Sequence, residues 1–126
     1  MPPALLNTSK SEILVEKLAI ADHLVARMVG LLGRKDLAPS DGLLIKPCNA
    51  IHMMFMNFAI DAVFLDRDLQ VLKIIHELRP WRMTACAGAA MVLELRAGTA
   101  AYKGLEPGHR LALTKSSQLH DITLCR

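Results

Sequence analysis

Asp61 and Glu94 are the residues whose setting most clearly suggests chemistry, because each carboxyl group interrupts an apolar run. The two runs read AIDAVFL and AMVLELRAG. A carboxylate among buried neighbours is costly unless it is paired or hydrogen-bonded. We therefore expect each acid to have a partner, either backbone amides or an arginine such as Arg27 or Arg34, and to act mainly in holding the fold together. In the alternative reading, the two acids share a cleft with His52 and take part in binding or acid–base chemistry.

A second suggestive stretch, CNAIHMMFMNFAID, brings imidazole and thioether groups close to Asp61. If residues 50–56 are extended, Ala50, His52, Met54 and Met56 face the same way. Such a face could hold Cu(I), but methionine is also a common core filler, and neither HxxH nor CxxC spacing is present. We expect no metal and no cofactor. The candidate binding cleft predicted from the sequence comprises His52, Met54, Met56, Asp61, Glu94 and Arg34.

Motifs for nucleophilic catalysis and for phosphate binding are absent from the sequence. No serine lies in a GxSxG elbow, and neither Cys48 nor Cys86 has a base beside it in the chain. The GLLGRK segment fits neither GxxxxGK[ST] nor GxGxxG. No catalytic residue is therefore assigned.

The charge and the cysteine content limit which partners and which cellular compartment are expected. The net charge is +3, and the 15 basic residues are scattered without interleaved aromatics, so no nucleic-acid partner is expected. The three cysteines are odd in number and widely spaced, which predicts free thiols and a reducing compartment. With no signal-like segment and no apolar run near the ~18 to 20 residues that span a bilayer, the sequence predicts a cytoplasmic protein without a membrane partner.

The elements that must position these residues are mostly short strands. A length of 126 residues fits one domain, 1–126, with a tail over residues 115–126. The one principal helix is expected between Asp22 and Arg34, where apolar residues recur at helical spacing after a good N-cap. Strands are expected over 12–20, from Gly42, in the apolar runs up to residue 66, on both sides of a turn at residues 66–68, and near the end of the chain. Pro80 and Trp81 break the pattern, residues 84–90 are expected to be a loop, and TAAYKGL, from Thr99, is expected to form one or two helical turns. The sequence thus predicts a mainly β domain, a small antiparallel sandwich or barrel.

The ordered set RMVGLLGR, GLLI, IHMMFM, IDAVFLD, a proline at position 80, VLELRAG and GLEPGHRL resembles the family known as domain of unknown function 192, or uncharacterised protein family 0127. The resemblance implies a compact, mainly β fold with a short helix near the start, and it implies no activity. The family pattern is matched at Arg27, Gly30, Leu31, Gly33, Arg34, Gly42, Leu43, Met56, Asp61, Phe64, Leu93, Glu94, Leu95, Ala97, Gly98, Gly104 and Gly108. Many members carry a Trp-Met-Lys-Asn-Thr run where this chain has FMNFA at residues 55–59, so no role for that lysine is carried over.

Three functions remain open on the sequence. The preferred one is a non-enzymatic module that binds a small molecule or a peptide in a groove beside the His52 strand. The second is an enzyme of undefined class that uses Asp61, Glu94 and His52. The third is a structural or oligomer-forming domain. A pocket into which the three side chains converge would favour the first two, and a raised carboxyl pKa there would favour the enzyme.

Overall fold

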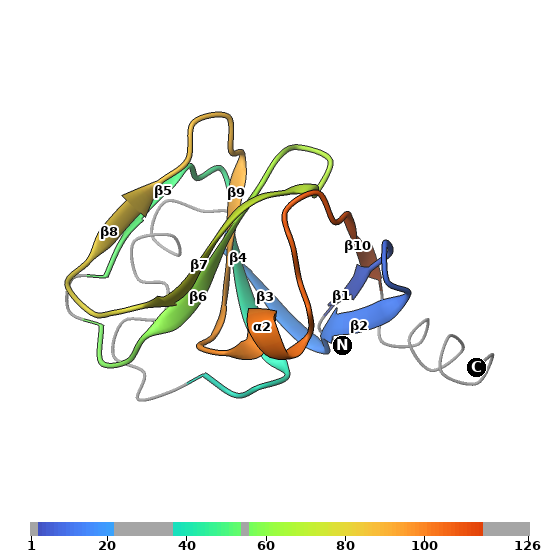
Figure 1. Ribbon diagram of the computed structural model, residues 1–126, viewed down its shortest axis with the longest axis horizontal. Coiled ribbons are helices and arrows are strands. Elements are labelled where there is room, and N and C mark those ends of the chain that lie inside the picture. The colour runs from blue at the N-terminus through green and yellow to red at the C-terminus, as the bar shows by residue number, and fades with distance from the viewer. Residues whose placement is uncertain (1–2, 22–36, 54–55, 115–126) are drawn as a thin grey trace.

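The computed structural model describes residues 3–21, 37–53 and 56–114, and these form a mainly β protein (Figure 1). The predicted helix at residues 22–34 and the tail at 115–126 lie outside the described residues. In chain order the elements are β1 (Ala4–Asn7), β2 (Glu12–Val15), β3 (Lys17–Ala21), β4 (Asp41–Ile45), β5 (Ala50–His52), β6 (Ile60–Leu65), β7 (Val71–Leu78), β8 (Met83–Ala85), β9 (Met91–Arg96), α2 (Thr99–Tyr102) and β10 (Leu111–Thr114). Within the described ranges, no helix has the length and apolar character needed to cross a membrane.

A five-stranded sheet in the order β3-β4-β9-β6-β7 forms the centre of the molecule. All six residues of β6 are buried, as is expected for a strand that is covered on both faces. Its pairs are antiparallel except for β3 and β4, which are parallel. This pair departs from the predicted antiparallel arrangement. Parallel neighbours need a long connection, and residues 22–40 supply it.

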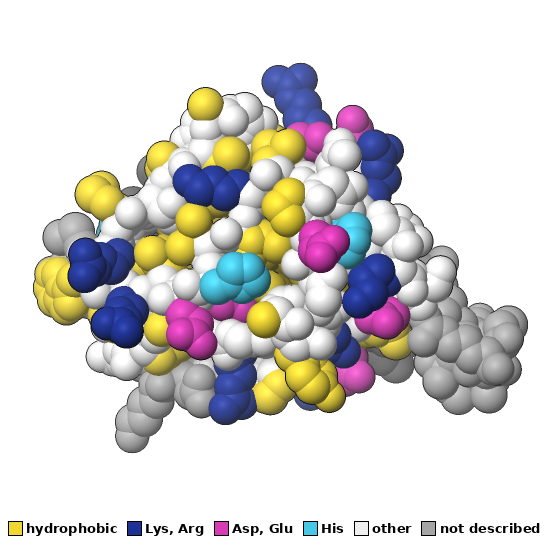
Figure 2. Space-filling view, in the orientation of Figure 1, with side chains coloured by type: hydrophobic (Ala, Val, Ile, Leu, Met, Phe, Trp, Pro, Cys, Tyr) yellow, Lys and Arg dark blue, Asp and Glu magenta, His cyan; other side chains and the backbone are white. Residues whose placement is uncertain are grey.

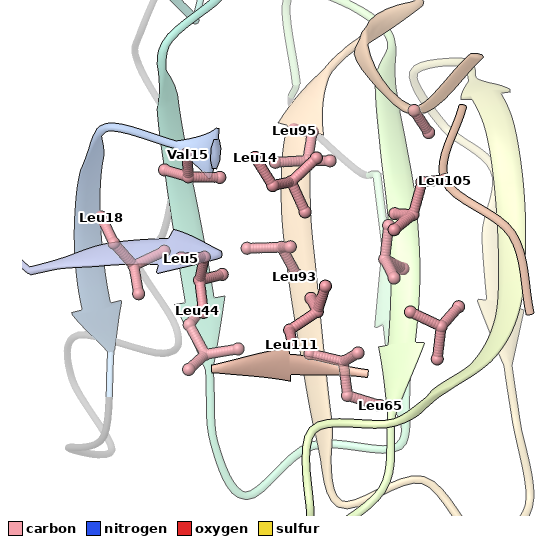
Figure 3. Close-up of a cluster of buried hydrophobic side chains, with 13 residues drawn as sticks. Leu5, Leu14, Val15, Leu18, Leu44, Leu65, Leu93, Leu95, Leu105 and Leu111 are labelled. Carbon is pink, nitrogen blue, oxygen red and sulfur yellow. The ribbon is translucent and has the colours of Figure 1, made fainter. Parts of the chain in front are cut away.

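The two faces of the central sheet belong to two separate clusters of buried side chains. On the first face, Leu44, Leu93 and Leu95 pack against residues of the three-stranded sheet β10-β1-β2, including Leu5 and Leu111. Figure 3 shows these leucines meeting between the two sheets. We call this the first face.

The opposite side, the second face, is formed by alternate residues of the same strands. Phe64 and Val92 lie on it and share a cluster with Ile51, Met53 and other buried side chains. Ile51 belongs to β5, which pairs with β8 in a two-stranded ribbon. Both sides of the central strands are therefore buried, and a polar side chain on either side needs a hydrogen-bond partner within the protein.

Several local predictions are confirmed and others need correction. The turn at residues 66–68 joins β6 to β7 in a hairpin, and Asp66 Oδ1 accepts hydrogen bonds from the Asp68 and Gln70 amides. The helical turn predicted around Thr99 is α2. The strand predicted over 12–20 is wrong as one element, because β2 pairs with β1 whereas β3 pairs with β4. Residues 84–90, expected to be a loop, begin with the end of β8.

Candidate functional site

Asp61 lies on the first face and is completely buried. Its Oδ1 accepts a hydrogen bond of 2.9 Å from the Glu77 amide, and its Oδ2 accepts one of 2.9 Å from the Ala100 amide. One amide belongs to β7 and the other to the first turn of α2, where backbone N–H groups have no partner within the helix. The carboxylate therefore ties two elements to β6, and both of its oxygens are engaged. The expectation of a backbone-amide partner is confirmed for Asp61.

A bulge in β7 brings the Glu77 amide to Asp61. The pairing of β6 with β7 shifts between Ile60, which is opposite Leu78, and Ala62, which is opposite Ile75. Two residues of β7 thus stand against the single Asp61, which is the definition of a bulge. Glu77 has a φ of 53°, an uncommon value for a residue other than glycine. The hydrogen bond to Asp61 stabilises this backbone conformation.

Glu94 lies on the second face, because it is directly opposite Leu43 of β4 and Ala62 of β6. Its side chain is only 7% exposed. Among residues 3–21, 37–53 and 56–114, none donates a hydrogen bond to its carboxyl group or forms an ion pair with it. Burial raises the pKa of Glu94 from 4.5 to about 7. Near neutral pH the group is therefore divided between its protonated and ionised forms.

The register of β6 and β9 separates the two carboxyl groups. Asp61 is opposite Leu95, whereas Glu94 is opposite Ala62. Directly opposed residues project to the same face of a sheet and successive residues project to opposite faces. Asp61 and Glu94 therefore lie on different faces, and the predicted cleft shared by both acids is wrong.

His52 and Met56 are also placed differently from the predicted common face. His52 and Ala50 are exposed on β5, while Ile51 between them is buried. Met56 is 8% exposed and packs in the second-face cluster. The strand ends at His52, so the alternation does not continue to Met56. Met54 and Arg34 lie outside the described residues.

Metal ligands do not gather in the part of the chain that the structure describes. No group of three or more His, Cys, Asp or Glu side chains suited to a metal ion is found there. Cys48 and Cys86 are free thiols, and Cys125 lies outside the described ranges. His52 is exposed whereas Met56 is buried, so these two do not share the face that the Cu(I) reading required.

One open cavity, of about 540 Å³, was not predicted. It is bordered by three loops, and its lining comprises Pro47, Cys48, Asn49, Arg67, Gly88, Ala89 and Ala90. None of the six predicted cleft residues belongs to it. Turn-forming residues such as Pro47 and Gly88 mark the loops in the sequence, but only the tertiary structure shows that the loops meet.

Replacing Asp61 with alanine should destabilise the protein. The change leaves two backbone amides without their acceptor, and a buried unsatisfied donor costs about 1 to 3 kcal/mol, so the free energy of unfolding should fall by about 2 to 6 kcal/mol. His52→Ala is the control, because changes at exposed sites stay within about 0.5 kcal/mol. Urea denaturation checks both values. An Asp61→Ala variant as stable as the parent would contradict the structural role.

Replacing Glu94 with glutamine should have a pH-dependent effect. A difference of one unit between the pKa of a group in the folded and in the unfolded protein corresponds to about 1.4 kcal/mol. For Glu94 these values are about 7 and 4.5, so keeping the carboxyl ionised in the folded protein costs about 3 kcal/mol. The free energy of unfolding of the parent therefore falls as the pH rises from 4.5 to about 7, because the unfolded chain releases the Glu94 proton at a lower pH than the folded protein does. Glu94→Gln should therefore match the parent near pH 4 and exceed its stability by up to about 3 kcal/mol near pH 8.

The control for this titration is Glu16→Gln, which makes the same chemical change at an exposed position. Its difference from the parent should not vary with pH over this range. Denaturation series at several pH values give both differences. A constant difference between Glu94→Gln and the parent would show that the pKa of Glu94 is not raised in the folded protein and would contradict this account. This expectation replaces the sequence-based one, in which Glu94 had a stabilising partner.

Comparison with known proteins agrees with the resemblance seen in the sequence. A UPF0127 protein of Thermococcus sibiricus is 31% identical over 116 residues, which cover 85% of this chain and 72% of that protein. Two crystal structures share the fold at 24% identity. One is a protein of unknown function from Novosphingobium aromaticivorans, with a TM-score of 0.77 over 89% of this chain and 84% of that chain. The other, from Sinorhizobium meliloti, is described as a "putative transcription regulator", with a TM-score of 0.74 over 88% of this chain and 91% of that chain. The family model of DUF192, described as "Uncharacterized ACR", matches residues 5–113, and the chain belongs to this family.

Proposed function

We propose that the chain is a binding module for a small molecule and that Glu94 is the group that recognises the ligand. One observation carries the proposal: the Glu94 carboxyl is only 7% exposed, and no described residue pairs with it. A buried carboxyl group that contributes nothing to the fold is costly, and such groups are concentrated at functional sites.

The surroundings of Glu94 indicate the chemical class of the ligand. Its neighbours on the second face, Leu43 and Ala62, are apolar, and so is most of the cluster around them. Binding sites for small molecules are typically apolar with a few polar groups that fix the orientation. A carboxylate only accepts hydrogen bonds. The fitting ligand therefore has an apolar body and a cationic donor, such as a primary amine or a guanidine.

An enzymatic role has less support than binding. A carboxyl group with a pKa near 7 suits a general base. However, the enzyme reading needed Asp61 and His52 beside Glu94. Asp61 lies on the other face with both oxygens engaged, and His52 is exposed. Arg34, Met54 and Met56 stay in the proposal as candidate residues of the site, with Met56 as apolar lining.

A thermal-shift panel of alkyl amines, alkyl guanidines and the matching alcohols tests this function. At pH 8 the parent should melt at a higher temperature with an amine or a guanidine than with the alcohol of the same chain length, because a ligand of the native state stabilises it. Glu94→Gln should lose this difference, corresponding to at least about tenfold weaker binding. Glu16→Gln should retain it.

Two results would overturn the proposal. The first is that no cation in the panel stabilises the parent more than its alcohol does. The second is that Glu94→Gln responds as strongly as the parent, which would place any binding elsewhere.

A further inference from the structure

The turn between β7 and β8 holds a tryptophan in a conformation that tryptophan rarely adopts. The Arg82 amide donates to the Arg79 carbonyl at 3.3 Å and closes a four-residue turn. Pro80 occupies its second position, and Trp81 its third with a φ of 70°. This combination is typical of a type II turn, in which glycine is favoured at the third position. A bulky residue there is an outlier of the kind that concentrates at functional sites.

The same turn is fastened to the end of β5. The Trp81 amide donates to the Met53 carbonyl at 2.7 Å, and the Met53 amide donates to the Arg82 carbonyl at 2.7 Å. Met53 itself is buried in the second-face cluster. The tip formed by residues 79–83 is therefore held in place and presents its side chains in a defined direction.

Large apolar side chains of the tip face solvent. Trp81 is 62% exposed and Met83 is 78% exposed. The ribbon continues this surface, because Ala50 and Ala85, which are paired, are exposed as well. Single exposed apolar residues are common on proteins. Here two of the largest exposed ones lie two residues apart on one anchored turn, at the end of the molecule that β8 occupies (Figure 1).

Two basic side chains flank the tip, and an exposed acid, Glu77, lies two residues before it on β7. Arg79 and Arg82 are exposed on either side of Trp81. Neither residues 42–60 nor residues 78–93, the two stretches that contain the ribbon, include an aspartate or a glutamate. On the face shown in Figure 2, blue and yellow side chains gather at this end of the molecule, and magenta side chains border them on the side toward the centre. The tip is thus apolar, basic and free of acidic side chains within both stretches.

We propose that this tip is a peripheral docking surface for anionic lipid bilayers. Tryptophan favours the membrane–water interface, where its ring is partly buried among the headgroups. Basic residues near an anionic leaflet add attraction that salt weakens. Such docking needs no spanning segment, so the sequence-based expectation of no membrane partner, which rested on the absence of a span, does not bear on it.

Other anionic partners fit the described residues less well. Single-stranded nucleic acid is bound by several aromatic rings that stack on successive bases. In the described ranges, Phe64 is buried, Phe58 packs against the second-face cluster, and the exposed Tyr102 belongs to α2 rather than to the tip. A protein partner would be an acidic surface, and the vesicle assay below separates it from a lipid bilayer. The exposed tip, with its apolar side chains and two arginines, suits the surface of an anionic bilayer.

Tryptophan fluorescence tests the proposal, because Trp81 is the single tryptophan of the chain. Vesicles of phosphatidylcholine with phosphatidylglycerol should shift its emission to shorter wavelength, and brominated lipid in those vesicles should quench it. Pure phosphatidylcholine vesicles should have little effect, and added salt should reverse the shift. Co-sedimentation of the protein with the vesicles measures the partition.

Variants separate the tip from the rest of the surface. Trp81→Gly places glycine where the backbone favours it, so the fold should be retained, while vesicle binding should weaken at least about tenfold. Arg79→Glu combined with Arg82→Glu should abolish binding to anionic vesicles. The matched controls are Tyr102→Ala, which removes an 88% exposed aromatic ring elsewhere, and Lys17→Glu on β3. Both should bind as the parent does.

Several outcomes would overturn the proposal: equal binding to neutral and anionic vesicles, no spectral shift, or full binding by Trp81→Gly. Quenching by an oligothymidylate without vesicle binding would assign the tip to nucleic acid. Binding of polyglutamate without vesicle binding would assign it to an acidic protein surface. The amine panel and the vesicle assay concern different residues, so either proposal can fail without the other.

Discussion

The burial of β6 and β9 on both faces is the constraint on which the rest of the structure depends. These strands lie between two apolar clusters, and no water-facing side is available to them. A polar side chain in such a strand has to be satisfied by the protein, by a ligand or by protonation. The two carboxyl groups in these strands meet this requirement in different ways.

Asp61 meets it with backbone amides. Because one donor belongs to β7 and the other to α2, the carboxylate ties the bulged edge strand and the short helix to β6. A helix of four residues has little stability of its own, since short helices form only when tertiary contacts support them. We interpret Asp61 as the group that replaces the side-chain cap that Gly98, at the start of α2, cannot provide.

Glu94 is satisfied only in part, because its raised pKa keeps a fraction of the carboxyl groups protonated, and therefore uncharged, near neutral pH. Natural proteins tolerate such costs where function requires them. The central sheet thus has a hydrogen-bonded carboxyl group on its first face and, on its second, one that no described residue pairs with. This division of roles separates the two acids that look equivalent in the sequence.

Much of this fold could be predicted from the sequence, and the limits have physical causes. Apolar runs such as IDAVFL indicated buried strands, and the buried setting of Asp61 and Glu94 was predicted correctly. The faces could not be predicted, because they depend on the register between strands far apart in the chain. The donors of Asp61 lie 16 and 39 residues away, and both are backbone groups that leave no mark in the sequence. Trp81 was recognised only as a break in a pattern, since its positive φ and its exposure follow from the turn.

Direct titration of the Glu94 carboxyl group by carbon-detected nuclear magnetic resonance tests the central claim most directly. The signal is assigned by its absence from the spectrum of Glu94→Gln. An unpaired, buried carboxyl group should titrate with a midpoint near the value of about 7 that burial imposes. A midpoint at or below the ordinary value of 4.5 would show that the group is solvated or paired with a cation, and would contradict the role assigned to Glu94.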